Sequence, residues 1–301
     1  MGKHPAVHYV TYFDFTHCNL AAASIVSAVR TQNFARLTMV VPDYPADDPR
    51  ASVFSGMIEN LLGLDSRIES VPVGQIWEEG ADDTVRRLLD RSAGTVMSPA
   101  HLFSDALRAQ LLPWFGRPVL WFDVDMLFIR DVSDVFDLAS RVSVAAAPDR
   151  ISTLGDRRGM AIYQRFTEFA NRQETGLMTD QPARNIGFML LAADVRKEFS
   201  DGLKKALEFL PTESDPIASF SVGQLAWNYV FEKSESVTLD QGYNMPSACF
   251  PESWHTAPDG QSAEDVRVRH YVGVEQKKRM TLDFALEFAH HRSETVTAGR
   301  P

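Results

Sequence analysis

The stretch PVLWFDVDMLFI, residues 118–129, decides the fold class of this chain. Residues 118–122 are apolar, as is typical of a strand that is buried on both faces of a sheet. Asp123 and Asp125 follow at once, and a second apolar run occupies residues 126–129. In open α/β sheets, ligands gather beyond the carboxyl ends of such strands. The stretch therefore predicts a buried strand that brings two carboxylates to the ligand-binding edge of a sheet.

Strand and helix patterns alternate on both sides of this stretch. Short β-branched or aromatic runs predict strands at residues 7–12, 37–41, 68–73, 118–122, 141–147, 185–192 and 266–272. Apolar residues at helical spacing predict helices at residues 20–31, 52–62, 100–112, 195–210, 222–231 and 282–290. Pro113 is expected to end the third of these helices, and residues 241–261 are expected to be irregular. The alternation predicts the α/β class, with a single doubly wound, mostly parallel sheet flanked by helices.

The bulk composition excludes several classes of protein. The chain has 301 residues, 45% hydrophobic and 23% charged, which is the composition of a globular protein and not of a disordered or fibrous one. A net charge of −10 argues against a nucleic acid partner, because phosphate backbones are bound by clustered Lys and Arg. No run has the length of a membrane span, and residues 1–9 lack the apolar stretch of a secretory signal. We therefore expect a cytoplasmic protein.

Asp123 and Asp125 form a pair with definite chemistry. Side chains two positions apart on a strand face the same side, so both carboxylates can approach one ion. Carboxylate oxygens are hard ligands that suit Mg²⁺ or Mn²⁺ shared with the oxygens of a phosphate. The same D-x-D spacing also occurs in solvent-exposed turns. The buried strand that precedes the pair is what favours a functional site here.

A second group of candidate residues lies further along the chain. His270 can supply a third metal ligand, and Gly273 permits a close approach of the backbone to a phosphate. Lys277 and Lys278 can balance the charge of a diphosphate. A histidine at a strand edge is often structural, and a run of cations is often only a solvated surface. Their combination with the D-x-D pair is what favours a phosphate-bearing ligand.

In these motifs the chain resembles the family-eight glycosyltransferases, which have the GT-A nucleotide-sugar fold. The matching pieces follow the family's order along most of the chain. VLWFDVDMLFIRDVSDVF, residues 119–136, is similar to the family's strand, metal motif, second strand and small helix. Four later segments also resemble family motifs: the Asn-x-Gly turn at 185–187, the D-Q-D-x-L-N segment at 224–228, an Asn-bearing loop at 242–244 and the closing His-x-x-Gly at 270–273.

The resemblance implies a role for each candidate residue. Asp123, Asp125 and His270 correspond to metal ligands, and Mn²⁺ or Mg²⁺ is the implied cofactor. Gln224 and Asp149 correspond to catalytic residues on the sugar side. The residues that correspond to contacts with the nucleotide sugar are Asp14, Thr16, Arg108, Asp123, Val124, Asn185, Gly273, Lys277 and Lys278.

The implied activity is metal-dependent transfer of a hexose from a nucleoside-diphosphate sugar, a UDP-sugar above all. The acceptor would be a glycan, a lipid-linked glycan or another hydroxyl compound, and the resemblance implies retention of the anomeric configuration. The family has acids beside the glutamine, whereas this chain has Gly223 and Leu225, which excludes a carboxylate nucleophile there. Retention would then proceed by front-face attack. If the reaction instead inverts, Asp149 or Asp180 becomes the candidate base.

The domain organisation follows from the same resemblance. We expect one GT-A-like glycosyltransferase domain over residues 1–292 and a flexible tail over 293–301. Residues 7–130 would form the nucleotide-sugar-binding half, and residues 131–292 the acceptor-side half.

Three other interpretations stay open. The missing acids beside Gln224 suggest a nucleotide-sugar-binding protein without turnover, and a structural partner of another transferase is also conceivable from the sequence. A haloacid-dehalogenase-like phosphatase begins with a hydrophobic strand and D-x-D as well. Leu127 stands where that class has Thr or Val, and most of a sheet precedes the motif here, so the phosphatase interpretation is disfavoured.

Overall fold

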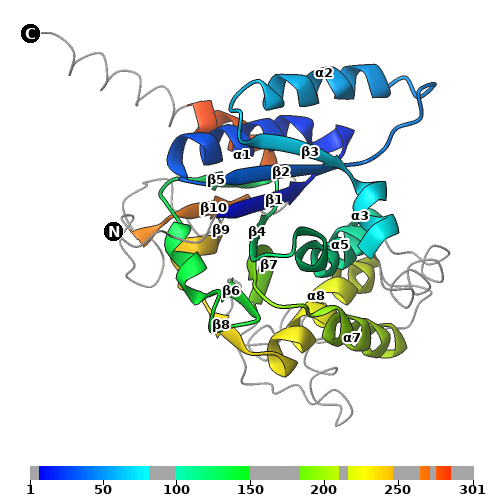
Figure 1. Ribbon diagram of the computed structural model, residues 1–301, viewed down its shortest axis with the longest axis vertical. Helices are drawn as coiled ribbons and strands as arrows, with labels where there is room; N and C mark the ends of the chain where they lie inside the picture. Colours follow the sequence, from blue (N-terminus) through cyan, green and yellow to red (C-terminus); the bar gives the residue numbers. More distant parts are fainter. Residues whose placement is uncertain are drawn as a thin grey trace, which may run out of the picture.

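A seven-stranded sheet forms the centre of the molecule (Figure 1). The computed structural model describes residues 7–80, 99–148, 184–209, 216–246, 265–271 and 276–285. The strands of this sheet follow the order β3-β2-β1-β4-β7-β6-β8. Their bounds are His8–Tyr12 for β1, Arg36–Val41 for β2, Ile68–Pro72 for β3, Val119–Phe122 for β4, Val144–Pro148 for β6, Arg184–Leu191 for β7 and Ser236–Thr238 for β8.

The sheet is mainly parallel, which confirms the fold class predicted from the sequence. β1 runs parallel to both of its neighbours, β2 and β4, and β2 runs parallel to β3. β7 lies antiparallel between β4 and β6, while β6 and β8 are parallel. The chain passes from β1 outward to β2 and β3, and then crosses to β4 on the other side of β1. The switch in strand order therefore lies between β1 and β4, where open α/β sheets bind their ligands.

Helices cover both faces of the sheet (Figure 1). The α-helices are α1 Cys18–Thr31, α2 Ala51–Leu62, α3 Val73–Gly80, α5 Pro99–Phe115, α7 Arg196–Phe209 and α8 Pro216–Lys233, and residues 276–285 are also helical. Tyr9 and Phe122 pack with α1 and α2 on one face. Val10 and Trp121 pack with α5, α7 and α8 on the other. Within the described ranges, none of the helices combines the length and the apolar character that crossing a bilayer requires.

A second, smaller sheet has three strands in the order β5-β10-β9. Its strands are β5 Met126–Phe128, β9 Met245–Pro246 and β10 Val268–His270. β10 runs antiparallel to β5 with His270 opposite Met126, and it runs parallel to β9. This pairing places the end of β10 beside the turn that joins β4 to β5.

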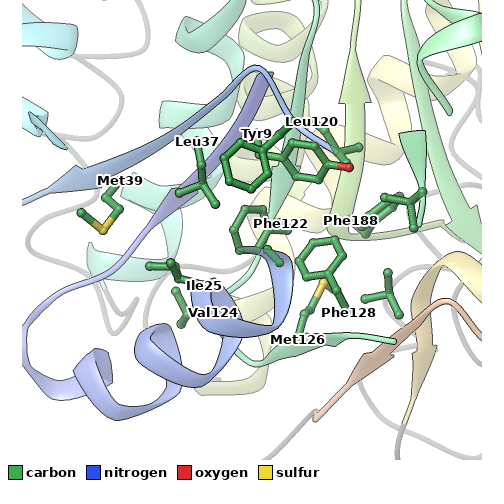
Figure 2. Close-up of a cluster of buried hydrophobic side chains, with 14 of the residues drawn as sticks. Tyr9, Ile25, Leu37, Met39, Leu120, Phe122, Val124, Met126, Phe128 and Phe188 are labelled. Atoms are coloured by element: carbon green, nitrogen blue, oxygen red, sulfur yellow. The ribbon is translucent and has the colours of Figure 1, made fainter. Parts of the chain in front are cut away.

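An aromatic cluster packs against β4 and β5, the two strands that flank the β4–β5 turn (Figure 2). The ring centroid of Tyr9 lies 6.3 Å from that of Phe122 and 5.9 Å from that of Phe128. The rings of Phe122 and Phe128 meet edge to face with centroids 5.1 Å apart. Because all three rings are buried, truncation of either Phe to Ala would cost on the order of 3–5 kcal/mol. The cluster therefore fixes the ends of β4 and β5, and with them Asp123 and Asp125.

Several elements differ from those expected. The helix that was expected to end at Pro113 continues to Phe115. Its end is set by Gly116, which has a φ of 60° and donates its N–H to the Leu112 carbonyl at 2.8 Å. A proline in the last turn removes only one backbone donor, whereas a left-handed glycine turns the chain away. The last helix was expected to begin at 282, but residue 276 is already helical, so Lys277 lies on this helix. The short elements α3, β8 and β9 were not predicted.

Candidate functional site

A pocket opens at the carboxyl ends of β1 and β4, at the switch in strand order. Residues from the β1–α1 connection, α5, the β4–β5 turn and the helix at 276–285 contribute to it. The lining consists of Tyr12, Phe13, Asp14, His17, Ser104, Asp105, Arg108, Asp123, Val124, Asp125 and Lys277. Carboxylates and cations are thus gathered in one place, as a charged ligand with a metal ion requires.

Asp123, Asp125 and His270 come together as a potential metal site. One ligand atom from each of them lies within 4.8 Å of the other two. His270 Nε2 is 3.3 Å from Asp125 Oδ1, and the backbone N–H of Tyr271 donates to the Asp125 carbonyl at 2.8 Å. The antiparallel pairing of β10 with β5 produces these contacts. Two carboxylates and an imidazole form a donor set that fits Mn²⁺ or Mg²⁺.

A relay of amide side chains orients His270. The backbone N–H of Gly187 donates to Asn185 Oδ1 at 2.8 Å, so this atom of Asn185 is the acceptor. Asn244 Nδ2 donates to the same oxygen at 2.9 Å, which leaves Asn244 Oδ1 to accept from His270 Nδ1 at 2.9 Å. The Nδ1 of His270 therefore carries a proton, and Nε2 is the nitrogen that faces Asp125. With a proton on Nε2 the imidazole donates to Asp125, and with Nε2 deprotonated this nitrogen can bind a metal ion.

The Asn-x-Gly segment, expected to be a turn, lies within strand β7, and its contacts explain why position 187 is a glycine. A side chain at this position would begin 2.9 Å from His270 Cε1 and 2.7 Å from Met126 Cε. The Gly187 carbonyl also accepts the backbone N–H of Asp123 at 2.8 Å. The glycine thus allows the imidazole to approach and fixes the backbone of one carboxylate.

Asp125 is buried yet negatively charged. Burial by itself would raise the pKa of this carboxyl group, but His270 and Lys277 together hold the pKa of Asp125 well below its usual value. Lys277 Nζ lies 2.9 Å from Asp125 Oδ2. The ammonium group therefore neutralises this oxygen of Asp125, while His270 faces Oδ1.

Asp123 is held from the side of α5. Arg108 Nη2 donates to Asp123 Oδ1 at 2.8 Å, and Trp121 Nε1 donates to the same oxygen at 2.9 Å. The guanidinium of Arg108 also lies over the Trp121 ring, 4.7 Å from its centroid, and pairs with Asp105. Burial raises the pKa of Asp105 to about 7, although Arg108 favours its ionised form.

Asp14 follows β1 and also lines the pocket. Asp14 Oδ1 accepts the backbone N–H of Thr16 at 3.0 Å and the Thr16 hydroxyl at 2.6 Å. His17 Nδ1 lies 2.8 Å from the same oxygen, and this hydrogen bond is the main reason why the pKa of Asp14 falls to about 2. The carboxylate therefore stays ionised across the physiological range.

Of the other predicted site residues, some line the pocket and others do not. Val124 is buried and lines the pocket, whereas Lys278 is exposed and does not. Gln224 is also outside the pocket lining, because its Nε2 donates to the Arg184 carbonyl at 2.7 Å. Asp149 and Gly273, together with the alternative base Asp180, lie outside the described residues.

Sequence reasoning assigned no role to Asp105 or Asn244. The spacing of Asp105 and Arg108, three positions apart on a helix, was a signal for an ion pair. Asn244 lies in the loop that resembles an Asn-bearing loop of the family, but only the structure shows that it contacts His270.

The architecture of the chain matches that of solved glycosyltransferases. The galactosyltransferase LgtC, in complex with donor and acceptor sugar analogues, has a TM-score of 0.56 with this chain at 15% identity, over 92% of this chain and 96% of that one. Mouse xyloside xylosyltransferase 1 in its apo form has a TM-score of 0.53 at 12% identity, over 88% and 96%. GlyE of Streptococcus pneumoniae TIGR4 has a TM-score of 0.51 at 15% identity, over 96% and 64%.

No protein-family model matches the chain, and no curated protein matches it in sequence. The similarity to these structures therefore identifies the fold, and it confirms the GT-A-like architecture that the motifs predicted.

Proposed function

We propose that the protein is a metal-dependent glycosyltransferase that transfers a hexose from a nucleoside-diphosphate sugar to a hydroxyl acceptor. The observation that carries this proposal is the meeting of Asp123, Asp125 and His270 at the strand-order switch, beside the pocket that Asp123, Asp125 and Lys277 line. A metal and a diphosphate need carboxylates and a cation in such an arrangement. The resemblance to family-eight enzymes makes a UDP-sugar the first donor to test, and a glycan or lipid-linked glycan the first acceptor.

The metal site would be held by Asp123, Asp125 and His270. The fit rests on their shared geometry and on the amide relay that leaves His270 Nε2 available as a ligand. When bound there, Mn²⁺ or Mg²⁺ would supply Lewis-acid stabilisation of the departing diphosphate. Asp14, which also lines the pocket, would contact the nucleoside, with one carboxylate oxygen already bonded to Thr16.

Lys277 is the residue that would balance the charge of the leaving group. In the absence of ligand its ammonium group pairs with Asp125 Oδ2 at 2.9 Å. A metal ion bound by Asp125 would compete for this oxygen, and the lysine stem, which is one-third exposed, leaves room for the ammonium group to turn toward a diphosphate. The negative charge that develops on the leaving group would then find a cation already in the pocket.

Retention is the stereochemical outcome that we propose. Gly223 and Leu225 carry no carboxylate, so α8 offers no nucleophile at the positions beside Gln224. Front-face attack by the acceptor, assisted by the departing phosphate, fits this absence. Proton NMR of the product formed from an α-linked donor should show an α-linkage, and a β-linked product would exclude retention.

The decisive experiment is a panel of nucleoside-diphosphate sugars with and without Mn²⁺, monitored by thermal shift and by donor hydrolysis. Wild type is compared with Asp125→Ala and with Asp47→Ala, which removes an exposed carboxylate away from the pocket. We expect one donor to stabilise wild type and Asp47→Ala in a metal-dependent way and to be hydrolysed by both. Asp125→Ala should lose both responses.

Other outcomes have defined meanings. Metal-dependent stabilisation by a donor without hydrolysis, even with candidate acceptors added, would favour a nucleotide-sugar-binding protein without turnover. No response of wild type to any donor would exclude the glycosyltransferase proposal.

A further inference from the structure

Gly223 on α8 lies so close to Asp105 that a side chain at position 223 would overlap with it. A Cβ added to Gly223 would lie 1.7 Å from Asp105 Oδ2 and 2.4 Å from Asp105 Cγ. Both contacts are far shorter than any real Cβ makes, so Asp105 occupies the volume that a side chain on α8 would need. The two helices are also joined here by the indole of Trp227, which donates to the Asp105 carbonyl at 3.0 Å.

Asp105 uses this space to pair with Arg108. The carboxylate of Asp105 contacts Arg108 Nη1, while Arg108 Nη2 donates to Asp123 Oδ1 at 2.8 Å. The side chain of Arg108 is only 4% exposed, so this guanidinium is not a mobile surface cation. Each of its two terminal nitrogens faces a different carboxylate. Planar pairing of this kind restricts the orientation of both partners.

We propose that Asp105 is a positioning residue for the metal site, and that it acts by holding Arg108 against Asp123 from the space that Gly223 leaves open. This inference rests on the proposed metal site and deepens it. Arg108 then serves mainly to orient a metal ligand, and contact with the donor diphosphate falls to Lys277. The position of the Asp105 carboxylate on α5 therefore depends on the absence of a side chain at Gly223 on α8.

The first test measures Mn²⁺ affinity directly, without donor or acceptor. The full-length protein is titrated with Mn²⁺ at pH 8, and free Mn²⁺ is followed by electron paramagnetic resonance. Asp105→Asn keeps the shape of the side chain and removes its charge, and we expect the affinity to fall about tenfold, as for other residues that orient metal ligands. Asp65→Asn removes a carboxylate that pairs with Arg67 away from the pocket, and it should leave the affinity unchanged.

A second pair of variants tests whether Asp105 needs the space beside Gly223, without changing the charge of any residue. Gly223→Ala should displace Asp105 and weaken Mn²⁺ binding to a similar extent, although it alters no charged or metal-binding residue. Gly56→Ala is the matched control, because a Cβ on this other helical glycine would meet nothing within 4 Å. Circular dichroism and thermal unfolding of each variant verify that it is folded.

The exchange variant Asp105→Gly with Gly223→Asp moves the carboxylate from α5 to α8. We expect it to recover Mn²⁺ affinity to within about threefold of wild type, because the two contacting positions are coupled and not additive. Wild-type affinity in both Asp105→Asn and Gly223→Ala would overturn the inference while leaving the metal site intact. If wild type itself binds no Mn²⁺, the metal site fails, and the inference fails with it.

Discussion

Two acidic clusters face the same pocket, and they are built in different ways. The local cluster consists of Asp14, Thr16 and His17, which are neighbours in sequence. The assembled cluster consists of Asp105, Arg108, Asp123, Asp125, His270 and Lys277, which come from α5, the β4–β5 turn, β10 and the helix at 276–285. The local cluster can form as soon as its own loop forms, whereas the assembled cluster forms only when distant elements have packed together.

The difference is also electrostatic. The side chain of Asp14 is 30% exposed, so water assists its neighbours in keeping it charged. The side chain of Asp125 is 10% exposed, and its charge depends on His270 and Lys277. Loss of a partner should therefore be costly in the assembled cluster and mild in the local one.

The largest effect concerns Asp105 and pH. Its pKa is about 7 in the folded protein against the ordinary 3.8 of an aspartic acid, so the folded state binds this proton more tightly. The stabilisation is fully present below about pH 4 and is lost as the pH rises through 7. Asp105→Asn removes this dependence, and its free energy of unfolding relative to wild type should therefore rise by as much as about 4 kcal/mol from pH 4 to 8.

Urea unfolding of both proteins at a series of pH values measures this difference. His8 acts in the opposite direction over the same range, because burial lowers its pKa to about 4. This contribution is common to wild type and variant and cancels in the comparison. A constant difference between the two proteins would contradict the prediction.

The amide relay gives the next largest effect. Asn244→Ala removes the acceptor of His270 Nδ1, so the imidazole can rotate or change its tautomer. We expect Mn²⁺ affinity to fall about tenfold to a hundredfold, as when a partner of a metal-binding histidine is lost. Isothermal titration with Mn²⁺ measures this change. Asn60→Ala, an exposed amide on α2, is the control, and equal affinities in the two variants would exclude the relay.

Lys277 should show opposite effects on metal and donor. Lys277→Met frees Asp125 Oδ2, so Mn²⁺ affinity without donor should stay the same or rise. Affinity for the donor in the presence of Mn²⁺ should fall about tenfold, because a charge-assisted contact with the diphosphate is lost. Lys204→Met on α7 is the control for the loss of a partly exposed lysine. A parallel fall in both affinities would mean that Lys277 supports the metal site itself.

The local cluster should give the smallest effect. Asp14→Ala removes one contact to the nucleoside at a partly exposed position, so donor affinity should fall only about fivefold. Mn²⁺ affinity should not change, because the structure places Asp14 in no contact with Asp123, Asp125 or His270 within the described residues. A loss of Mn²⁺ binding in this variant would remove the distinction between the two clusters.

The sequence predicted the parts of the site that depend on local patterns. The apolar runs around Asp123 and Asp125 form β4 and β5 because both are buried, and burial leaves a visible pattern. The alternation of strands and helices likewise predicted the sheet. The position of the carboxylates at the edge of β4 followed from these two facts.

Features that depend on long-range contacts were not predictable in the same way. β9 has two residues, too few for any periodicity, and its pairing with β10 is set by the fold. The contact between Asp105 and Gly223 joins two helices that are distant in sequence, and no local sequence pattern predicts it. Gln224 stays a predicted residue of the sugar site, and its hydrogen bond to the Arg184 carbonyl, 40 positions away, is a contact that no local pattern predicts.

The pairing of β10 with β5 has a consequence for the newly made chain. On the ribosome, Asp123 and Asp125 emerge long before His270, and the third ligand joins them only after β10 has added to its sheet. The growing polypeptide therefore lacks the third ligand of the proposed metal site until β10 has paired with β5. A metal ion would meet all three ligands only after these strands have come together, so its binding would follow this step of folding and not initiate it.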